Sequence, residues 1–275
     1  MSNLSISVVI YKTPPKVEES FLSSLLNSIK HLRKYGNISD VQLFIINNSD
    51  YHTARQSVFL NRREEIDELC IAFQFLTGHG NIGYGRAHNL VLDQIKSDHH
   101  LILNPDVTFE NDSILQALTT IDSDKNIKLL SPFAYDLEGK KQYLCKSYPS
   151  ILTLFLRGFA PERIRRFFAQ RLSAYEVQEL SENEPNKGIE IISGCFMLIN
   201  TAAWKKVEGF DETFFLYFED FDLSIRVGRL GDIIYAPNVR IRHGGGNASS
   251  KGLRHLRAFI SSGVRFFNKH GWRFF

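Results

Sequence analysis

The first hundred residues alternate between short apolar runs and amphipathic helical patterns, and this alternation constrains the fold more than any other feature. An apolar run over residues 4–11 ends before Pro14 and Pro15, which indicates a buried strand followed by a loop. Apolar residues then recur at helical spacing over 21–32, and a second apolar run covers 41–46. Strand, helix and strand in this order favour a parallel sheet covered by helices, with ligands at the carboxyl ends of the strands.

The alternation continues through the next segments and then becomes less regular. Strands are expected over 71–76 and 100–103, with a glycine-rich loop and a helix between them that carries Ala87, Leu90, Val91 and Ile95 on one face. A helix over 114–121 and extended segments over 127–133, 189–200 and 235–243 follow, whereas 148–186 mixes helix and loop. We therefore predict an α/β protein with a mixed, mostly parallel central sheet flanked by helices.

Composition and charge narrow the class of protein. The chain has 275 residues, of which 43% are hydrophobic, and no repeat or linker divides it, so we expect a sizeable core, either in one large α/β domain or in two closely joined halves. A net charge of +3 is too small to imply nucleic-acid binding. Cys70, Cys145 and Cys195 are too widely spaced for a disulfide framework or a metal motif. With neither a signal peptide nor an apolar run of about 18 residues, we expect a cytoplasmic protein with at most peripheral membrane contact.

The basic residues are concentrated near the C-terminus. From Arg240 onward there are eight Lys or Arg residues and no Asp or Glu. A second basic and aromatic stretch covers residues 155–172. These segments fit either an amphipathic surface that lies on an anionic membrane or a helix packed on the core with a solvated face. One helical face near the C-terminus carries Leu253, Leu256, Ile260, Val264 and Phe267.

The run FFLYFEDFDLSIR sets three carboxylates among aromatic side chains, just ahead of a helical pattern. They belong to Glu219, Asp220 and Asp222. Desolvation beside aromatic rings raises the pKa of a carboxyl group, and a general base that takes a proton from a hydroxyl benefits from that change. Asp220 is the candidate base. The alternative is structural, with the acids capping the helix and pairing with two downstream arginines.

A glycine-rich loop over residues 78–86 joins a predicted strand to a predicted helix. Free backbone N–H groups at a helix start favour an anion such as a phosphate. The loop lacks the third glycine of a dinucleotide-binding motif, which argues against a Rossmann dehydrogenase, and it lacks the G-K-[ST] of a P-loop. A plain tight turn is the alternative.

Asp106 and His243 are candidate metal ligands. Asp106 follows a strand that ends at Leu103, so it emerges at the carboxyl edge of the sheet. His243 ends a strand-like segment and opens a loop with three glycines. Mg²⁺ and Mn²⁺ are commonly held by one or two protein carboxylates plus substrate phosphates, and Mn²⁺ also accepts imidazole. The alternative for His243 is a surface histidine beside a turn.

In their order along the chain, these segments resemble the family 2 glycosyltransferases with the GT-A fold, and among them the bacterial rhamnosyltransferases of O-antigen and related cell-surface polysaccharide synthesis. The resemblance runs from Ser7 to about Trp272. It is carried by ISVVIY, IINNSD, GNIGYGRAHN, LILNPDV, ISGCFMLIN, VEGFDETFFLYFEDFDLSIR and the His243 loop. It implies one catalytic domain over 1–275, with a nucleotide-sugar half (1–110), an acceptor and catalytic half (111–243) and a basic amphipathic segment (244–275).

The resemblance also implies roles for individual residues. Asp220 would deprotonate the acceptor hydroxyl, and Asp106 and His243 would hold Mg²⁺ or Mn²⁺ against the donor diphosphate. Two positions depart from the family, because Asn47 and Asn104 stand where acidic residues are usual. The residues implied in nucleotide and substrate binding are Tyr11, Asn47, Asn48, Asp50, Asn81, Gly83, Arg86, Asn104, Gly194, Cys195 and Glu219.

The activity implied by the resemblance is an inverting, metal-dependent transfer of L-rhamnose from dTDP-L-rhamnose to a hydroxyl of a lipid-linked saccharide. The enzyme would work at the inner face of the cytoplasmic membrane and bind its anionic surface. Two alternatives stay open: a UDP-galactofuranose or UDP-hexose donor, and an inactive GT-A-like module that binds a nucleotide or glycan at the membrane. Pocket shape decides the choice of donor, so the sequence leaves it open.

Overall fold

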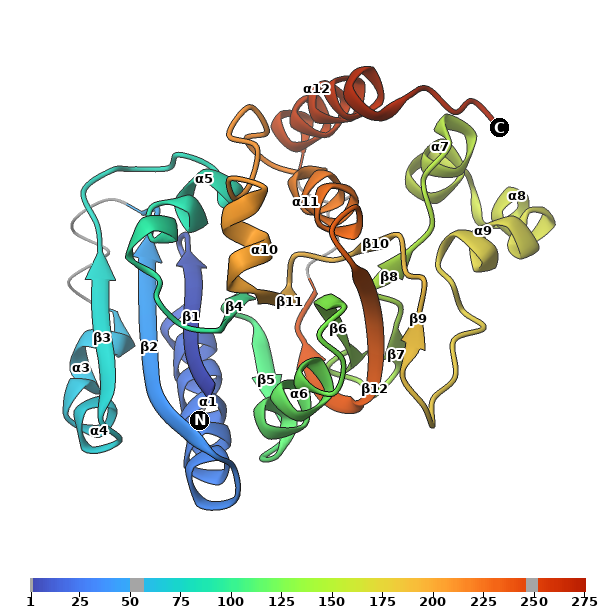
Figure 1. The fold of residues 1–275 in the computed structure, drawn as a ribbon. Helices are drawn as coiled ribbons and strands as arrows, with labels where there is room; N and C mark the ends of the chain where they lie inside the picture. The colour runs from blue at the N-terminus through green and yellow to red at the C-terminus, as the bar shows by residue number, and fades with distance from the viewer. Residues whose placement is uncertain (1, 50–56, 246–251) are drawn as a thin grey trace.

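A computed structural model describes residues 2–49, 57–245 and 252–275. Its described strands form a ten-stranded central sheet and a separate two-stranded sheet (Figure 1). The central sheet has the order β3-β2-β1-β4-β11-β6-β12-β5, with β7 beside β6 and β9 beside β12. Its strands are β1 (Ser2–Ile10), β2 (Ile38–Asn47), β3 (Ile71–Leu76), β4 (His99–Leu103), β5 (Val107–Phe109), β6 (Ile127–Tyr135), β7 (Lys141–Gln142), β9 (Asn186–Lys187), β11 (Phe196–Asn200) and β12 (Asp232–His243).

Strands β1 to β4 pair in parallel, as the alternating pattern predicted. The apolar residues of these strands are buried on both faces of the sheet, because helix α1 (Pro15–Tyr35) covers one face and later helices cover the other. Strand β11 is antiparallel to both of its neighbours, β4 and β6, and β12 runs parallel to β6. The sheet is therefore mixed and mostly parallel, which confirms the predicted fold class.

Short helices complete both layers around the sheet. The remaining described helices are α3 (Val58–Asn61), α4 (Arg63–Glu68), α5 (Tyr84–Asn89), the 3₁₀ turn η1 (Leu92–Gln94), α6 (Ser113–Asp122), α7 (Ile151–Phe159), α8 (Glu162–Phe167), α9 (Ala169–Tyr175), α10 (Thr201–Lys206), α11 (Glu219–Gly228) and α12 (Leu253–His270). The segment that mixes helix and loop in the sequence thus contains α7, α8 and α9.

The helix expected after the glycine-rich loop is shorter than its pattern. Helix α5 ends at Asn89, and Leu90 is 39% exposed instead of sharing the buried face with Ala87 and Val91. The Asn89 side chain exchanges hydrogen bonds with the backbone N–H and C=O of Phe210, at 2.9 and 2.8 Å. These long-range bonds fasten the last residue of the helix to another segment, so the chain turns there and leaves Leu90 outside.

The single extended segment expected over 189–200 is interrupted. Strand β10 (Ile191–Ile192) pairs with β8 (Cys145–Lys146) in the two-stranded sheet, whereas β11 pairs in the central sheet. Because the two pieces belong to different sheets, the chain must bend between them, and Gly194 lies in that bend. The interruption places backbone groups of Gly194 where side chains from other elements reach them.

Helix α12 packs over α11 at one end of the molecule (Figure 1). Phe266 and Phe267 are buried against Phe218, and an added Cβ at Gly263 would lie 3.3 Å from the Phe218 ring. The apolar face expected on this helix is split, because Phe267 is buried while Ile260 is 54% exposed. Contact with the aromatic residues of α11 therefore sets the orientation of the helix.

The C-terminal tail runs from α12 to the start of α7 (Figure 1). The backbone N–H groups of Ile151 and Leu152 donate to the carbonyls of Arg273 and Phe274, at 2.9 and 3.1 Å. These bonds use N–H groups that would otherwise be unpaired in the first turn of a helix. Along the described parts of the chain, none of the helices combines the length and the apolar character needed to cross a membrane.

Candidate active site

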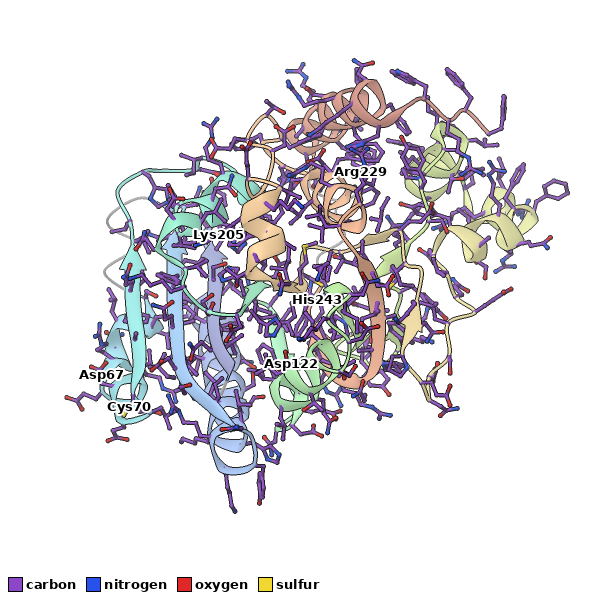
Figure 2. All side chains as sticks on the ribbon, in the orientation of Figure 1. Asp67, Cys70, Asp122, Lys205, Arg229 and His243 are labelled. Atoms are coloured by element: carbon purple, nitrogen blue, oxygen red, sulfur yellow. The ribbon has the colours of Figure 1, made fainter. Side chains whose placement is uncertain are left out.

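Asp106 and His243 come together where β4, β5 and β12 meet. Asp106 lies in the short connection between β4 and β5, and His243 is the last residue of β12, opposite Val107 of β5. The Nε2 atom of His243 lies 3.5 Å from Oδ1 of Asp106, and Gly244 donates its N–H to the Asp106 carbonyl at 2.9 Å. Figure 2 labels His243 near the centre of the view, and its side chain is 13% exposed.

Gln142 fixes the tautomer of His243. The Gln142 amide nitrogen donates to the His243 carbonyl at 3.2 Å, which leaves its Oε1 to accept from Nδ1 of the imidazole at 2.9 Å. Burial lowers the pKa of His243, and the nearby Asp106 charge opposes that shift. A neutral imidazole protonated on Nδ1 turns the Nε2 lone pair toward Asp106.

This pair fits a divalent cation. Oδ1 of Asp106 is buried without a hydrogen-bond partner, and it faces a second acceptor atom, the lone pair on Nε2 of His243. Two facing acceptors are stabilised by a cation between them. No group of three or more His, Cys, Asp or Glu residues within the described ranges is arranged to hold a metal ion. Two protein ligands suffice only where substrate phosphates supply others, as is common for Mg²⁺.

Glu219 and Asp220 begin helix α11, directly after Phe218, which adopts a left-handed conformation with φ of 65°. Oδ2 of Asp220 accepts the N–H of Gly194 at 2.9 Å, and its Oδ1 accepts the N–H of Phe221 at 3.0 Å. Burial raises the pKa of Asp220, while these N–H donors lower it. Two backbone donors therefore orient this carboxylate and favour its ionised form.

Glu219 is the other half of a buried carboxyl pair. Burial and the Asp220 charge together raise the pKa of Glu219 to about 8, and its Oε2 has no hydrogen-bond partner. Burial penalises the charge on both residues, but the N–H donors reach Asp220. The shared proton therefore resides on Glu219 near neutral pH, and Asp220 carries the charge.

Tyr84 holds the loop that carries these donors. Its hydroxyl donates to the Gly194 carbonyl at 2.6 Å, and an added Cβ at Gly194 would lie 3.3 Å from both Tyr84 and Asp220. The pKa of Tyr84 is well above its usual value because the hydroxyl is buried and because Cys195, Glu219, Asp220 and Asp106 lie near it. Tyr84 is thus within electrostatic range of carboxylates from both candidate centres.

Cys195 joins the two centres through the backbone. Its carbonyl accepts the N–H of Asn104 at 2.9 Å, just before Asp106, and its neighbour Gly194 bonds to Asp220. Burial raises the pKa of the Cys195 thiol to about 12, and the charges of Asp106 and Asp220 add to the shift. The structure therefore brings Asp106, Asp220 and His243 around one place, with residues 194 and 195 between them.

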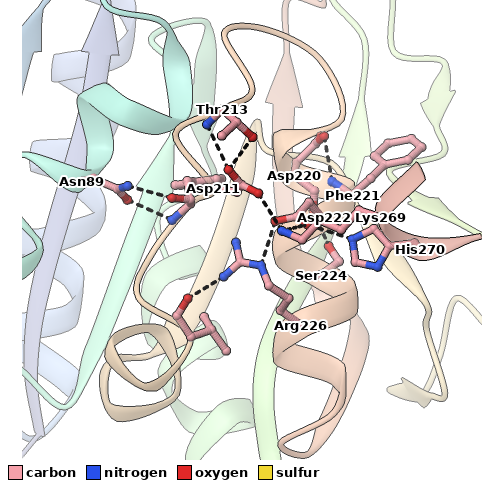
Figure 3. Close-up of polar contacts among 12 residues, drawn as sticks. Asn89, Asp211, Thr213, Asp220, Phe221, Asp222, Ser224, Arg226, Lys269 and His270 are labelled. Atoms are coloured by element: carbon pink, nitrogen blue, oxygen red, sulfur yellow. Dashed lines mark hydrogen bonds and ion pairs between the residues drawn. The ribbon is translucent and has the colours of Figure 1, made fainter. Parts of the chain in front are cut away.

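Asp222, the third acid of the block, has a structural environment. It is fully buried and accepts from Arg226 Nε at 2.7 Å, His270 Nε2 at 2.7 Å and Lys269 Nζ at 2.6 Å. Figure 3 shows these side chains meeting around the Asp222 carboxylate, apart from the carboxylate of Asp220. Asp222 therefore has the structural role, because it joins α12 to α11 through these cations. Glu219 and Asp220 have no cationic partner in the described residues, which suits the interpretation of Asp220 as a base.

The residues expected at the nucleotide lie at the ends of β1 and β2. Tyr11 is 48% exposed after β1. Asn47 donates to Thr77 Oγ1 at 3.2 Å and accepts from the Ser49 N–H at 3.0 Å. Asn48 donates to the Gly83 carbonyl at 3.0 Å. Asp50 lies outside the described residues.

The glycine-rich loop is a turn in which two backbone N–H groups at the start of α5 already have hydrogen-bond partners. The N–H of Gly83 donates to Asn81 Oδ1 at 3.2 Å, and the N–H of Tyr84 donates to the Phe215 carbonyl at 3.2 Å. These bonds favour the tight-turn interpretation over a phosphate cradle at this helix start. Arg86 forms an ion pair with Glu212 at 3.0 Å, and both side chains are about half exposed.

Three residues of this region were not predicted from the sequence to belong to the site. Tyr84 lies within the quoted GNIGYGRAHN segment, but nothing in that segment shows that its hydroxyl reaches Gly194. Gln142 lies in no motif. Tyr175 lies in the segment that mixes helix and loop. Its hydroxyl is buried without a partner, and burial raises its pKa, with a smaller contribution from the Asp220 charge.

Comparison with solved structures identifies the fold. The chain superposes on GalNAc-T7, solved with UDP, GalNAc and Mn²⁺, with a TM-score of 0.63 and 14% identity, covering 97% of this chain and 48% of that one. It also superposes on residues 1–349 of TarS from S. aureus, with a TM-score of 0.57 and 14% identity, covering 97% and 66%. The fold is that of the GT-A glycosyltransferases.

Comparison with curated sequences gives a narrower likeness. The chain is 27% identical over 209 residues to the N-acetylglucosaminyl-diphospho-decaprenol L-rhamnosyltransferase of Mycobacterium tuberculosis, covering 70% of this chain and 66% of the relative. It is 24% identical over 220 residues to the rhamnosyltransferase WbbL of Escherichia coli, covering 77% and 76%. The chain thus matches just under two thirds of the mycobacterial relative's length. No family model matches the chain. The likeness to rhamnosyltransferases expected from the sequence is confirmed.

Proposed function

We propose that the chain is an inverting glycosyltransferase that moves L-rhamnose from dTDP-L-rhamnose to a hydroxyl of a lipid-linked saccharide in cell-surface polysaccharide synthesis. One observation carries the proposal: the Asp106–His243 pair and the Asp220 carboxylate meet around residues 194 and 195. A donor diphosphate needs neutralising charge, and an acceptor hydroxyl needs a base. This arrangement offers both beside one another.

Asp106 and His243 would hold Mg²⁺ or Mn²⁺ against the donor diphosphate. The bound metal would neutralise charge on the departing nucleoside diphosphate. Gln142 keeps Nε2 of His243 unprotonated and turned toward Asp106. Asn104 in place of a carboxylate lowers the negative charge of the site, so metal affinity would depend strongly on the donor phosphates.

Asp220 would take the proton from the acceptor hydroxyl. Its carboxylate is fixed by two backbone N–H donors, and burial raises its pKa toward the working range of a general base. Glu219 would keep the pair's proton and so leave Asp220 as the anion. Direct attack by the deprotonated hydroxyl inverts the anomeric centre in one displacement and needs no enzyme nucleophile.

A screen of nucleotide-sugars tests the activity. Purified protein would be incubated with a lipid-linked saccharide, Mn²⁺ and, in turn, dTDP-L-rhamnose, UDP-galactofuranose or a UDP-hexose, and nucleoside diphosphate release would be measured. We expect release with dTDP-L-rhamnose, an inverted product by NMR, and a loss of about 100-fold or more in Asp220→Asn. Asp93→Asn, an exposed acid on η1, is the matched control and should keep full activity.

Failure of every donor to react, with a correctly folded protein, would contradict the enzymatic proposal and favour the inactive binding module. Release with a UDP-sugar alone would support the glycosyltransferase activity and identify a UDP-sugar, not dTDP-L-rhamnose, as the donor. UDP is present in solved structures of both TarS and GalNAc-T7, which is why UDP-sugars belong in the screen.

We also propose that one surface of the protein rests on an anionic membrane. Helices α7 and α8 and the C-terminal tail lie at the same end of the molecule (Figure 1), and all three carry exposed aromatic residues. Arginines on α8 accompany them, which suits a negatively charged lipid surface. Sedimentation with phosphatidylglycerol vesicles, but not with neutral phosphatidylcholine vesicles, is expected. The exposed aromatic residues are Phe155, Phe159, Phe167, Trp272, Phe274 and Phe275.

A further inference from the structure

A pair of cations outside the Asp106–Asp220 centre shares a single carboxylate. Lys146 of β8 and Arg157 of α7 lie 3.7 and 3.4 Å from the same oxygen of Glu176. Lys146 is 7% exposed, and burial lowers its pKa to about 8. One carboxylate balances only one of the two cations, so the cluster has an excess of positive charge. Such an excess beside the buried Lys146 favours an anionic ligand.

Tyr175 provides an unused hydrogen-bonding group at the same place. Its side chain is 4% exposed, and its hydroxyl has no hydrogen-bond partner. Lys146 Nζ lies 5.8 Å from the centre of the Tyr175 ring. A buried hydroxyl without a partner is costly in a folded protein, unless a ligand or water completes it. Two cations and an unsatisfied hydroxyl together are the groups that bind a phosphate.

The cluster is connected to the candidate catalytic centre. Lys146 pairs with Ile191 in the two-stranded sheet, and Ser193 donates its N–H to the Leu144 carbonyl at 2.9 Å, one residue before Gly194. Three residues of extended chain span roughly 10 Å, so the backbone of Ile191, opposite Lys146, lies within about that distance of Gly194. Burial is the main cause of the raised pKa of Tyr175, and the charges of Arg157 and Asp220 shift it further in opposite directions, so the hydroxyl lies within electrostatic range of both.

We propose that Arg157, Lys146 and Tyr175 bind the diphosphate of the lipid-linked acceptor. The inference rests on the proposed glycosyltransferase function and adds the subsite for the acceptor's charged group. The mycobacterial relative is named for an acceptor in which a single sugar separates the diphosphate from the end that is glycosylated. That order matches an anion site a short distance from Asp220. Arg157 is about half exposed, so the subsite opens to the surface where a lipid chain must leave.

Glu176 occupies the cations when no diphosphate is bound. The diphosphate must compete with this carboxylate for Arg157 and Lys146. Removing the charge of Glu176 should therefore tighten diphosphate binding, whereas removing either cation should weaken it. If the ion pairs were purely structural, removing the charge of Glu176 would not increase the affinity for diphosphate.

Binding of geranyl diphosphate, a soluble probe with the same charged group, tests the proposal without turnover. Calorimetric titrations would be run with saturating dTDP and Mn²⁺, so that the donor site is filled. We expect Kd to rise about tenfold or more in Arg157→Ala and in Lys146→Met, because hydrogen bonds to charged groups are lost. Tyr175→Phe should raise Kd by a smaller factor, and Glu176→Gln should lower it.

Arg63→Ala is the matched control, because it removes an arginine that is about half exposed, like Arg157, from helix α4 on the opposite side of the molecule (Figure 1). Unchanged binding in both Arg157→Ala and Lys146→Met, or an equal loss in Arg63→Ala, would overturn the proposal. Equal binding of dihexanoyl phosphatidylglycerol would assign the site to a phospholipid headgroup and would also overturn it. Titration of dTDP alone tests the donor site separately. Arg157→Ala should leave dTDP binding unchanged, so wild-type dTDP binding without geranyl diphosphate binding would reject the acceptor subsite and leave the proposed function standing.

Discussion

Replacing Glu219 by Gln should remove a titration that destabilises the folded chain near neutral pH. The Glu219 carboxyl is 5% exposed, its Oε2 has no partner, and Asp220 lies beside it. Burial and the Asp220 charge raise the pKa of Glu219 from 4.5 to about 8. Between these two values the folded chain keeps a proton that the unfolded chain has released. Stability therefore falls as pH rises through this window and levels off above it.

The size of the effect follows from the same values. Each unit of pKa difference corresponds to about 1.4 kcal/mol, so the difference between 4.5 and about 8 amounts to about 5 kcal/mol over the whole window. Glu219 and Asp220 share the proton, and we take about half of this value as the lower bound. A change of about 2.5–5 kcal/mol shifts Tm by about 5–10 °C in a chain of this size. Gln has the shape of a protonated Glu and does not titrate.

Thermal unfolding between about pH 5 and pH 8 measures this difference. The Tm of Glu219→Gln minus that of the wild-type chain should grow as pH rises through the window. Glu179→Gln is the matched control, because Glu179 is exposed on the surface, and its curve should stay parallel to that of the wild type. A curve for Glu219→Gln that also runs parallel to the wild type would show that Glu219 ionises normally, and the reasoning would be refuted.

Further substitutions test other parts of the structure. Tyr84→Phe frees the Gly194 carbonyl, so we expect kcat to fall about tenfold and its pH profile to shift, with the donor KM nearly unchanged; an unaltered pH profile would contradict this. Asp222→Asn leaves buried cations unpaired, and chemical denaturation should show a loss of about 3 kcal/mol or more. Gly83→Ala places a Cβ 2.5 Å from the Phe215 carbonyl at a φ of 95°, so a loss of about 2 kcal/mol is expected, and a neutral result would refute the geometry.

The sequence was sufficient for the fold class because the strands of the first half are buried on both faces. The nearly continuous apolar run 41–46 is typical of a strand inside a covered sheet, and the helical spacing of residues 21–32 predicts a helix that covers it. Breaks in the pattern were harder to see. The bend at Gly194 depends on two different partner strands, β8 and β4, and pairing partners leave no mark in a local pattern.

For the acids of the FFLYFEDFDLSIR block, the sequence predicts burial but not the partners of each carboxylate. Desolvation of all three was foreseeable from their aromatic neighbours. Their division was not, because Asp222 finds Lys269 and His270 nearly fifty residues away, whereas Asp220 finds only backbone N–H groups. The same holds for Tyr84 and Gln142, whose hydrogen bonds orient Gly194 and His243 across long sequence separations.

Titration with dTDP, in the presence and absence of Mn²⁺, tests most directly whether Asp106, His243 and Asp220 form one donor and acceptor centre. We predict that Mn²⁺ strengthens dTDP binding in the wild-type chain and in Asp220→Asn, because that residue faces the acceptor. The strengthening should disappear in His243→Ala and persist in the control His31→Ala on α1. Equal strengthening in His243→Ala would contradict the assignment of the metal site, and with it the central claim.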